Sequence, residues 1–212
     1  MTPQLLLISD SRRFGWPATF NIAELACAAG VDAFMLREKD LDSARLLAAA
    51  SELRAITGSY GARLLLHSQA DVALAVGADG VHLAASEIAT LPQLRAWLRA
   101  PSMSLSVSCH SSDELQRAAE VGADFALLSP VFPTATHPGA PALGAARFHE
   151  LAVSTELPVV ALGGIDGGNR QQLVGFGVAV IGAIFAAADP AAAARMLLAE
   201  RLSVGDAERQ QA

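Results

Sequence analysis

Short apolar runs alternate with longer, Ala- and Leu-rich stretches of helical period along the whole chain. This alternation is typical of a parallel sheet with helices packed outside it. We expect strands at residues 5–9, 33–36, 63–66, 80–83, 104–108, 125–129, 159–162 and 178–181. We expect helices at about residues 21–29, 42–57, 70–76, 88–99, 112–121, 144–154, 168–175 and 190–200. Eight such units favour an α/β fold of the closed (β/α)8 TIM-barrel type, although the periodicity alone also admits an open doubly wound sheet.

Similar segments recur just before three of the predicted strands: Ala-Gly-Val-Asp-Ala from Ala29, Val-Gly-Ala-Asp-Gly from Val76 and Val-Gly-Ala-Asp-Phe from Val121. Each segment places a glycine where a helix ends before the next strand. The repeat therefore indicates barrel turns, not a binding site. We expect residues 1–201 to form a single barrel domain and residues 202–212 to form a polar C-terminal tail.

The composition fits one globular domain in a reducing compartment. With 212 residues, 52% of them hydrophobic and 17% charged, the chain can bury one core and lies near the lower size limit of a complete barrel. No apolar run reaches the roughly 18 residues that a membrane helix needs, and the apolar residues 5–8 lead into Ser9 and Asp10 without a basic leader. Cys27 and Cys109 have neither metal-ligand spacing nor a disulfide framework. We therefore expect a cytoplasmic protein with no membrane partner.

The charge distribution argues against a nucleic-acid partner. The net charge is −6, and Lys and Arg form no extended cluster, whereas a phosphate backbone requires a contiguous basic surface. Phosphate binding would therefore be local, supplied by a few placed cationic side chains and by backbone N–H groups at helix N-termini.

In such a barrel the site lies on the loops that follow the strands, because that end gathers eight strand termini around one cavity. The residues at these positions with polar side chains or glycine are Asp10, Arg12, Arg37, Lys39, Asp40, His67, Ser68, Glu87, Ser108, His110, Thr134, Thr136, His137, Gly163, Gly164 and Gly182. They are the candidates for function.

Two glycine segments predict a phosphate site. Gly163-Gly164 ends an apolar strand and opens the helix expected from residue 168, and Gly182 follows the last strand. Glycines there bring bare backbone N–H groups to an anion, and strands seven and eight of such barrels commonly hold phosphate. A Gly-Gly pair alone is more often a tight turn, so the prediction depends on both positions together.

Several segments together resemble the thiamine phosphate synthase superfamily. They are Leu36-Arg37-Glu38-Lys39-Asp40, Ala78-Asp79-Gly80-Val81-His82-Leu83, Ser106-Val107-Ser108-Cys109-His110, Ser129-Pro130-Val131-Phe132-Pro133-Thr134-Ala135-Thr136-His137 and the Gly-Gly loop. They span nearly the whole chain in the family's order. The resemblance implies a transferase of thiamine biosynthesis: a pyrimidine diphosphate ionises, and the ring nitrogen of a thiazole phosphate captures the carbocation.

The resemblance also implies roles for single residues. Arg37, Lys39 and Ser108 match positions that hold the diphosphate, on which negative charge grows in the transition state. His137 stands where the family usually has a lysine. The positions around the thiazole phosphate are matched by Thr134, Thr136, Gly163, Gly164, Ile181 and Gly182.

The departures from the family pattern fall on the diphosphate side. The usual glutamine that reads the pyrimidine amine is Met35, and the usual Asn-Asp-Arg after strand three is His67-Ser68-Gln69, which removes a magnesium carboxylate. The second magnesium carboxylate would be Glu87, one methylene longer than the usual aspartate, although Glu87 fits the first turn of a helix somewhat better than a metal site. Mg²⁺ is therefore implied with a weakened site, and no organic cofactor is implied.

Two alternatives stay open. The related thiazole tautomerases lack the magnesium carboxylates and need an acid/base; their usual histidine is Pro130 here, so His67, His110 or His137 would have to serve. The other alternative is a non-catalytic binder of thiazole phosphate or thiamine phosphate. Residues 136–140 also resemble barrels that some bacteria fuse to a Nudix hydrolase. In each case the partners expected are small phosphorylated substrates, and a homodimer is compatible with the sequence.

Overall fold

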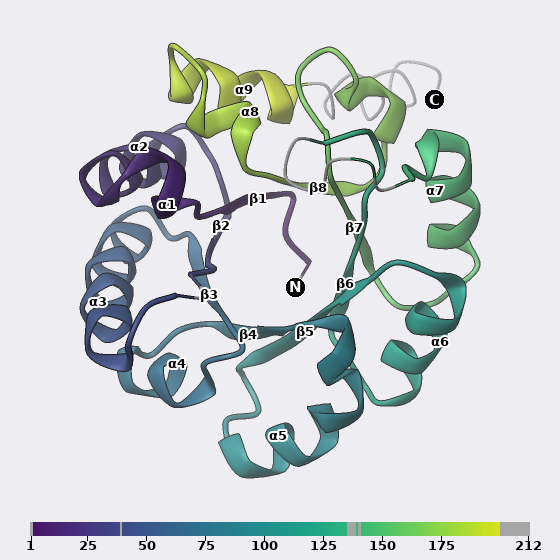
Figure 1. Cartoon of the computed structure of the whole chain (residues 1–212), viewed down its shortest axis with the longest axis horizontal. Helices are drawn as coiled ribbons and strands as arrows, with labels where there is room; N and C mark the ends of the chain where they lie inside the picture. The colour runs from purple at the N-terminus through teal and green to yellow at the C-terminus, as the bar shows by residue number, and fades with distance from the viewer. Residues whose placement is uncertain (1, 39, 135–138, 140, 200–212) are drawn as a thin grey trace, which may run out of the picture.

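The computed structural model describes residues 2–38, 40–134, 139 and 141–199. Eight parallel strands close into one barrel, each paired with its neighbours in chain order and β8 paired with β1. Figure 1 looks along the barrel and shows this ring with the helices outside it. The strands are β1 (Leu5–Ile8), β2 (Ala33–Leu36), β3 (Arg63–His67), β4 (Gly80–Leu83), β5 (Ser104–Cys109), β6 (Phe125–Leu128), β7 (Val159–Leu162) and β8 (Gly177–Val180). The predicted TIM barrel is confirmed.

The helices follow the strands on the outer surface (Figure 1). They are α1 (Ser11–Phe14), α2 (Trp16–Ala28), α3 (Ser43–Ser59), α4 (Ala70–Val76), η1 (Ala85–Thr90), α5 (Leu91–Leu98), α6 (Ser112–Glu120), α7 (Gly144–Val153), η2 (Arg170–Leu173), α8 (Gly182–Phe185) and α9 (Pro190–Ala199), of which η1 and η2 are 3-10 helices. The sequence did not indicate the short α1 and α8.

The helix expected at residues 168–175 is wrong. A 3-10 turn over Arg170–Leu173 stands in its place. The carboxylate of Asp166 accepts hydrogen bonds from the backbone N–H groups of Gly168 and Asn169. This local turn, together with two glycines of low helix propensity, competes with a regular helix.

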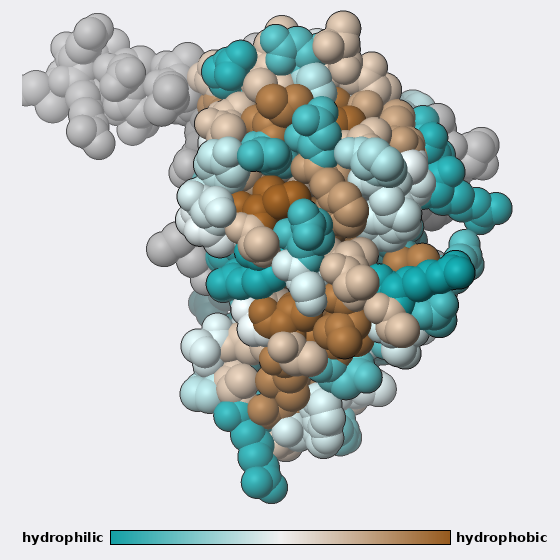
Figure 2. Space-filling model, turned by 90° about the vertical axis from the view of Figure 1, so that its left-hand side faces the viewer, coloured by the Kyte–Doolittle hydropathy of each residue, from teal (hydrophilic) through white to brown (hydrophobic). Residues whose placement is uncertain are grey.

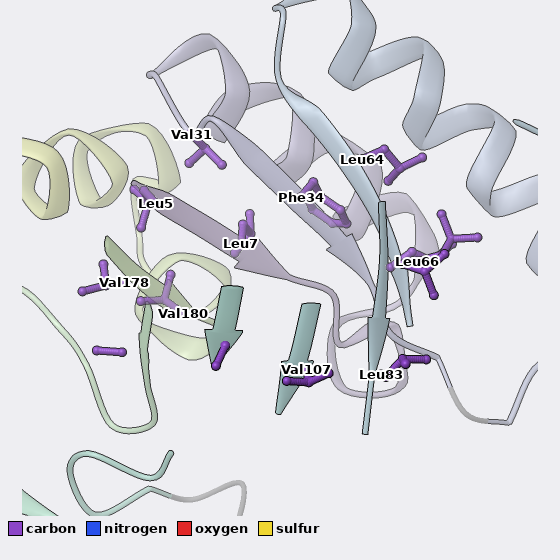
Figure 3. Close-up of a cluster of buried hydrophobic side chains, with 14 of the residues drawn as sticks. Leu5, Leu7, Val31, Phe34, Leu64, Leu66, Leu83, Val107, Val178 and Val180 are labelled. Atoms are coloured by element: carbon purple, nitrogen blue, oxygen red, sulfur yellow. The ribbon is translucent and has the colours of Figure 1, made fainter. Parts of the chain in front are cut away.

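The core has two parts, because side chains alternate between the two faces of a strand. On β1, Leu6 and Ile8 belong to the cluster inside the barrel, whereas Leu5 and Leu7 belong to the larger cluster between strands and helices. Figure 3 shows the outer cluster, with Leu5, Leu7, Phe34 and Leu64 fully buried. This packing fixes the strand ends that carry the site.

The predicted glycine turns lie at the amino ends of the strands. They include aspartate hydrogen bonds and ion pairs that the sequence did not indicate. In each, an aspartate accepts a hydrogen bond from the first part of the preceding strand and pairs with an arginine. The aspartates are Asp32, Asp79 and Asp124, their backbone donors are Leu5, Leu64 and Leu105 at 2.8, 2.8 and 2.6 Å, and their cations are Arg63, Arg54 and Arg95 at 3.0, 2.5 and 3.0 Å. These hydrogen bonds and ion pairs hold the strands in register and stabilise the end of the barrel opposite the candidate site.

The fourth position of this series differs. Phe176 directly precedes β8, as the aspartates precede β2, β4 and β6. Its ring packs edge-on against Phe148 at 5.1 Å and against His149 at 5.1 Å. An aromatic cluster thus stabilises the turn before β8, whereas carboxylates stabilise the turns before β2, β4 and β6.

The barrel accounts for the chain up to Ala199, and the predicted tail at 202–212 lies outside the described residues. Within the described part, no helix combines the length and apolar character needed to span a membrane. Figure 2 faces the side formed by α2, α3 and α4, where hydrophilic side chains interrupt the apolar areas. Exposed large apolar residues of these helices are Leu25, Leu47 and Leu74.

Candidate active site at the carboxyl ends of the strands

One half of the barrel end is polar and the other half is apolar. The polar side chains come from the ends of β2 to β5 and are Arg37, His67, His82 and Ser108, with Ser106 enclosed further inside the barrel. The opposite half, from β6, β7, β8 and β1, presents Leu127, Leu162, Ile181 and Ile8 of the inner cluster. A ligand here would meet polar groups on one side and hydrocarbon on the other.

Arg37 is a cation without a carboxylate partner among the described residues. It follows Met35 by two residues and so shares the inward face of β2 with that fully buried side chain. Its neighbours are already engaged: Glu38 accepts a hydrogen bond from the Ser11 N–H at 2.9 Å, and Asp40 pairs with Arg12 at 3.6 Å. Arg37 therefore does not form the local ion pair that a surface charge in this loop could form. Lys39 lies outside the described residues.

His82 lies on β4 and is almost completely buried, with 1% of its surface exposed. Its Nδ1 lies 2.9 Å from the Ser106 hydroxyl oxygen and its Nε2 lies 2.9 Å from the Ser108 hydroxyl oxygen. Burial lowers the pKa of His82 to about 3, and the charges of His67 and Arg37 act in the same direction. The ring is thus neutral near pH 7, and each of its nitrogens lies within hydrogen-bond distance of a serine hydroxyl.

Ser68 connects the ends of β3 and β4. Its backbone adopts a left-handed conformation with φ of 59°, and its hydroxyl donates to the Glu87 carboxylate over 2.6 Å. The same carboxylate oxygen accepts the Ala84 N–H at 2.9 Å. Because the Ser68 proton goes to the carboxylate, the His67 Nδ1, 3.1 Å from the Ser68 oxygen, is the donor in their contact.

This arrangement does not fit a built magnesium site. Mg²⁺ prefers carboxylate and other oxygen ligands in octahedral geometry. The region offers an imidazole, a hydroxyl and the single carboxylate of Glu87, one oxygen of which already accepts two hydrogen bonds. Across the described ranges, no three His, Cys, Asp or Glu side chains gather closely enough to hold a metal ion.

His110 bridges the loops after β5 and β6. The side chain is exposed, its Nδ1 lies 2.8 Å from the Ser129 carbonyl oxygen, and its backbone N–H donates to Glu114 over 2.6 Å. Ser111, not His110, caps α6 by accepting the Glu114 N–H. His110 therefore lies at the rim, tied to the residue before Pro130.

The loops after β6 and β7 are in direct contact. Gly163 and Gly164 have φ of 103° and 65°, and a Cβ on Gly164 would lie 2.8 Å from the Phe132 carbonyl oxygen. The Phe132 N–H donates to the Gly163 carbonyl at 2.9 Å. Thr134, half-buried, follows on the same loop, whereas Thr136 and His137 lie outside the described residues.

Gly182 lies at the same end of the barrel, since β7 and β8 are parallel neighbours. It begins the four-residue helix α8, and a Cβ at this position would meet open space. No described residue accepts a hydrogen bond from the N–H of Gly163, Gly164 or Gly182. The helix expected after β7 is replaced by a 3-10 turn, in which Asp166 accepts the N–H groups of Gly168 and Asn169. Phosphate binding by Gly163 and Gly164 stays a prediction.

The whole barrel is similar in sequence to known proteins. The family model described as thiamine monophosphate synthase matches residues 5–187. The chain belongs to this family. A thiamine-phosphate synthase of Methanoculleus marisnigri is 38% identical over 192 residues, covering 89% of this chain and 90% of the relative. One of Methanoregula boonei is 36% identical over 201 residues, covering 93% and 92%.

Solved structures agree with the family assignment. The thiamine phosphate pyrophosphorylase from Pyrococcus furiosus superposes with a TM-score of 0.84 at 30% identity, over 95% of this chain and 96% of that one. A 3-hexulose-6-phosphate synthase superposes with a TM-score of 0.70 at 21% identity, over 93% of this chain and 99% of that one, and shows the shared fold alone.

Sequence reasoning missed the role of Ser106 beside His82. A signal was available, because Ser104, Ser106 and Ser108 alternate with Leu105 and Val107 in one strand. Such alternation places the three serines on the inward face of β5.

Proposed function

We propose that this chain is a thiamine phosphate synthase, a transferase that joins a pyrimidine diphosphate to thiazole phosphate and releases diphosphate. The observation that carries the proposal is the family match over residues 5–187, with named synthases 36–38% identical over about nine-tenths of both chains. The polar half of the barrel end supports it, because Arg37 is a cation that no described carboxylate neutralises.

In the proposed reaction, the bond between the pyrimidine methylene carbon and the diphosphate oxygen breaks first. Both electrons leave with the diphosphate, and the thiazole ring nitrogen then donates a pair to the carbocation. Arg37 and Ser108 would stabilise the charge that grows on the departing oxygens. Lys39 and His137 are assigned to the same task.

The thiazole phosphate would bind at the loops after β6, β7 and β8. Thr134 and Thr136 would contribute hydroxyl groups, and Gly163, Gly164, Ile181 and Gly182 would contribute backbone. Support comes from the contact between the first two loops and from glycine N–H groups that have no acceptor in the described part of the chain. The apolar half of the barrel end, including Leu162 and Ile181, would limit the access of water to the carbocation.

The remaining expectations accompany this proposal. The substrates are small and phosphorylated, no organic cofactor takes part, and the protein acts in the cytoplasm. A homodimer, and dependence on Mg²⁺ supplied with the substrate, are predictions. The roles of Glu87 in metal binding and of His67, Ser68 and His110 in the cavity stay predictions too.

The decisive experiment incubates the purified protein with pyrimidine diphosphate and thiazole phosphate, with and without Mg²⁺. We expect thiamine phosphate and inorganic diphosphate in equal amounts, and omission of either substrate is the control. No product across a wide range of protein and metal concentrations would reject the synthase. Turnover of thiazole phosphate carboxylate would then indicate the tautomerase, and calorimetric binding without turnover would indicate the binder.

A further inference from the structure

The hydroxyl group of Ser106 lies inside the barrel with 0% of the residue exposed. Its one hydrogen-bond partner among the described residues is Nδ1 of His82, at 2.9 Å. On the other side of the same ring, Nε2 lies 2.9 Å from the hydroxyl of Ser108, which is half-buried at the carboxyl end of β5. The imidazole thus connects an enclosed hydroxyl to one at the candidate site.

A neutral imidazole has one N–H donor and one nitrogen acceptor. If Nε2 carries the proton, it donates to Ser108, and Nδ1 accepts the proton of Ser106. If Nδ1 carries the proton, it donates to Ser106, and Nε2 accepts the proton of Ser108. The two arrangements present opposite faces of Ser108 to a ligand: a donor proton in the first and oxygen lone pairs in the second.

Burial distinguishes the two arrangements. In the second, the Ser106 proton would have no acceptor among the described residues, although the group is enclosed. Proteins avoid buried donors without acceptors because such donors lose their hydrogen bonds to water. In the first arrangement the Ser106 proton and the His82 N–H both have acceptors. Only the Ser108 proton is left without one, and it points to the barrel end.

We propose that Ser106 and His82 are positioning residues that fix the Ser108 hydroxyl as a donor toward a phosphoryl oxygen at the barrel end. The enclosed serine sets the tautomer of the ring, and the ring sets the direction of the Ser108 proton. No atom is transferred in this arrangement. The choice of diphosphate as the ligand rests on the proposed function, whereas the direction of the hydrogen bonds rests on the geometry alone.

The first test is nuclear magnetic resonance of the ligand-free protein labelled with ¹⁵N-histidine, near pH 7.5. We expect the Nδ1 of His82 to resonate as an unprotonated nitrogen and Nε2 as a protonated one. A His82→Gln variant assigns the signals by their loss. The opposite tautomer, or a mixture of both, would overturn the proposal whatever the enzyme's activity.

The second test is a double-variant cycle on the binding of inorganic diphosphate, measured by calorimetry. We expect Ser106→Ala to weaken binding about threefold to tenfold and Ser108→Ala to weaken it at least as much. The double variant should bind no worse than Ser108→Ala, because Ser106 acts through Ser108. If the affinity losses of the two single variants multiplied in the double variant, Ser106 would not act through Ser108, and the proposal would be contradicted.

Ser104→Ala is the matched control. Ser104 lies on the same face of β5 nearer its amino end, and its hydroxyl donates to the Asp79 carbonyl at 3.2 Å. Its removal should leave diphosphate affinity unchanged. Failure of the unaltered protein to bind diphosphate would count against the proposed function. The tautomer measurement would still test separately the direction of the hydrogen bonds among Ser106, His82 and Ser108.

Discussion

Arg37 is the charged residue whose removal should affect catalysis most directly. We expect Arg37→Ala to lower kcat/KM by about 100-fold, since a charge-assisted hydrogen bond contributes roughly 1.5–3 kcal/mol. Arg37→Lys should recover part of this loss, because lysine keeps the charge but loses the planar fork. Steady-state kinetics with varied pyrimidine diphosphate provides the measurement.

Arg45 offers a control for this substitution. It is exposed on α3 and pairs with Asp42 at 3.4 Å. Arg45→Ala should leave kcat/KM within about twofold, in line with the small contribution of surface ion pairs. Equal activity of the Arg37 and Arg45 variants would remove Arg37 from the proposed mechanism.

Gly164 joins the loops after β6 and β7 and tolerates no side chain. We expect Gly164→Ala to destabilise the fold by about 1–3 kcal/mol, because φ is 65° and the new Cβ would meet the Phe132 and Pro133 carbonyl oxygens. Urea denaturation measures the change. Gly58→Ala, in α3 with open space around it, should instead be neutral or stabilising; an equal loss in both variants would contradict the steric argument.

At this scale the sequence located positions better than contacts. The places of Arg37 and Ser108 at the ends of their strands followed from the predicted strands, and the likeness to the family supplied their roles. The hydrogen bond from Ser68 to Glu87 could not be predicted, because it joins loops of different strands through a left-handed serine. The positions of site residues can be predicted from the local sequence. Hydrogen bonds between loops of different strands cannot, because they depend on the register of the strands.

The barrel turns should contribute strongly to stability. We expect Asp79→Ala to lower the free energy of unfolding by about 2–4 kcal/mol, because Leu64 loses its acceptor and Arg54 loses its partner. Chemical denaturation followed by circular dichroism measures it. Asp71→Ala, exposed in the first turn of α4, should cost less than about 1 kcal/mol. If the two variants lost the same free energy of unfolding, the contacts of Asp79 would contribute no more to stability than an exposed surface carboxylate.

Elements were predictable where one signal dominated. Each end of the eight strands was predicted to within one residue, because fully buried parallel strands are short and almost wholly apolar. The helix after β7 was not, because the Asp166 side chain and adjacent glycines form a tight turn that periodicity does not register. Local side-chain chemistry overrode the helical pattern there.

The whole molecule should lose stability in weak acid. The pKa of His82 is about 3 in the folded chain against an ordinary 6.5, so below pH 6.5 the unfolded chain takes up a proton that the folded chain does not. Stability from this residue is complete above pH 6.5 and declines by up to about 1.4 kcal/mol per pH unit as pH falls toward 3. Denaturation midpoints between pH 7.5 and 5 provide the measurement.

A His82→Gln variant is the comparison for this pH dependence. It should be less stable at pH 7.5 but should show a shallower decline between pH 6.5 and 5, a range above the ordinary pKa of carboxylates. Parallel pH profiles for the two proteins would show that the decline has another origin.

Phe176 makes the fourth corner of the barrel chemically unlike the other three. Hydrogen bonds and ion pairs of aspartates hold the strands that precede β2, β4 and β6, whereas ring contacts with Phe148 and His149 surround Phe176. Apolar contacts weaken at low temperature. Backbone amide exchange should therefore accelerate first around β7 and β8 in the cold, so that this part of the ring opens before the rest.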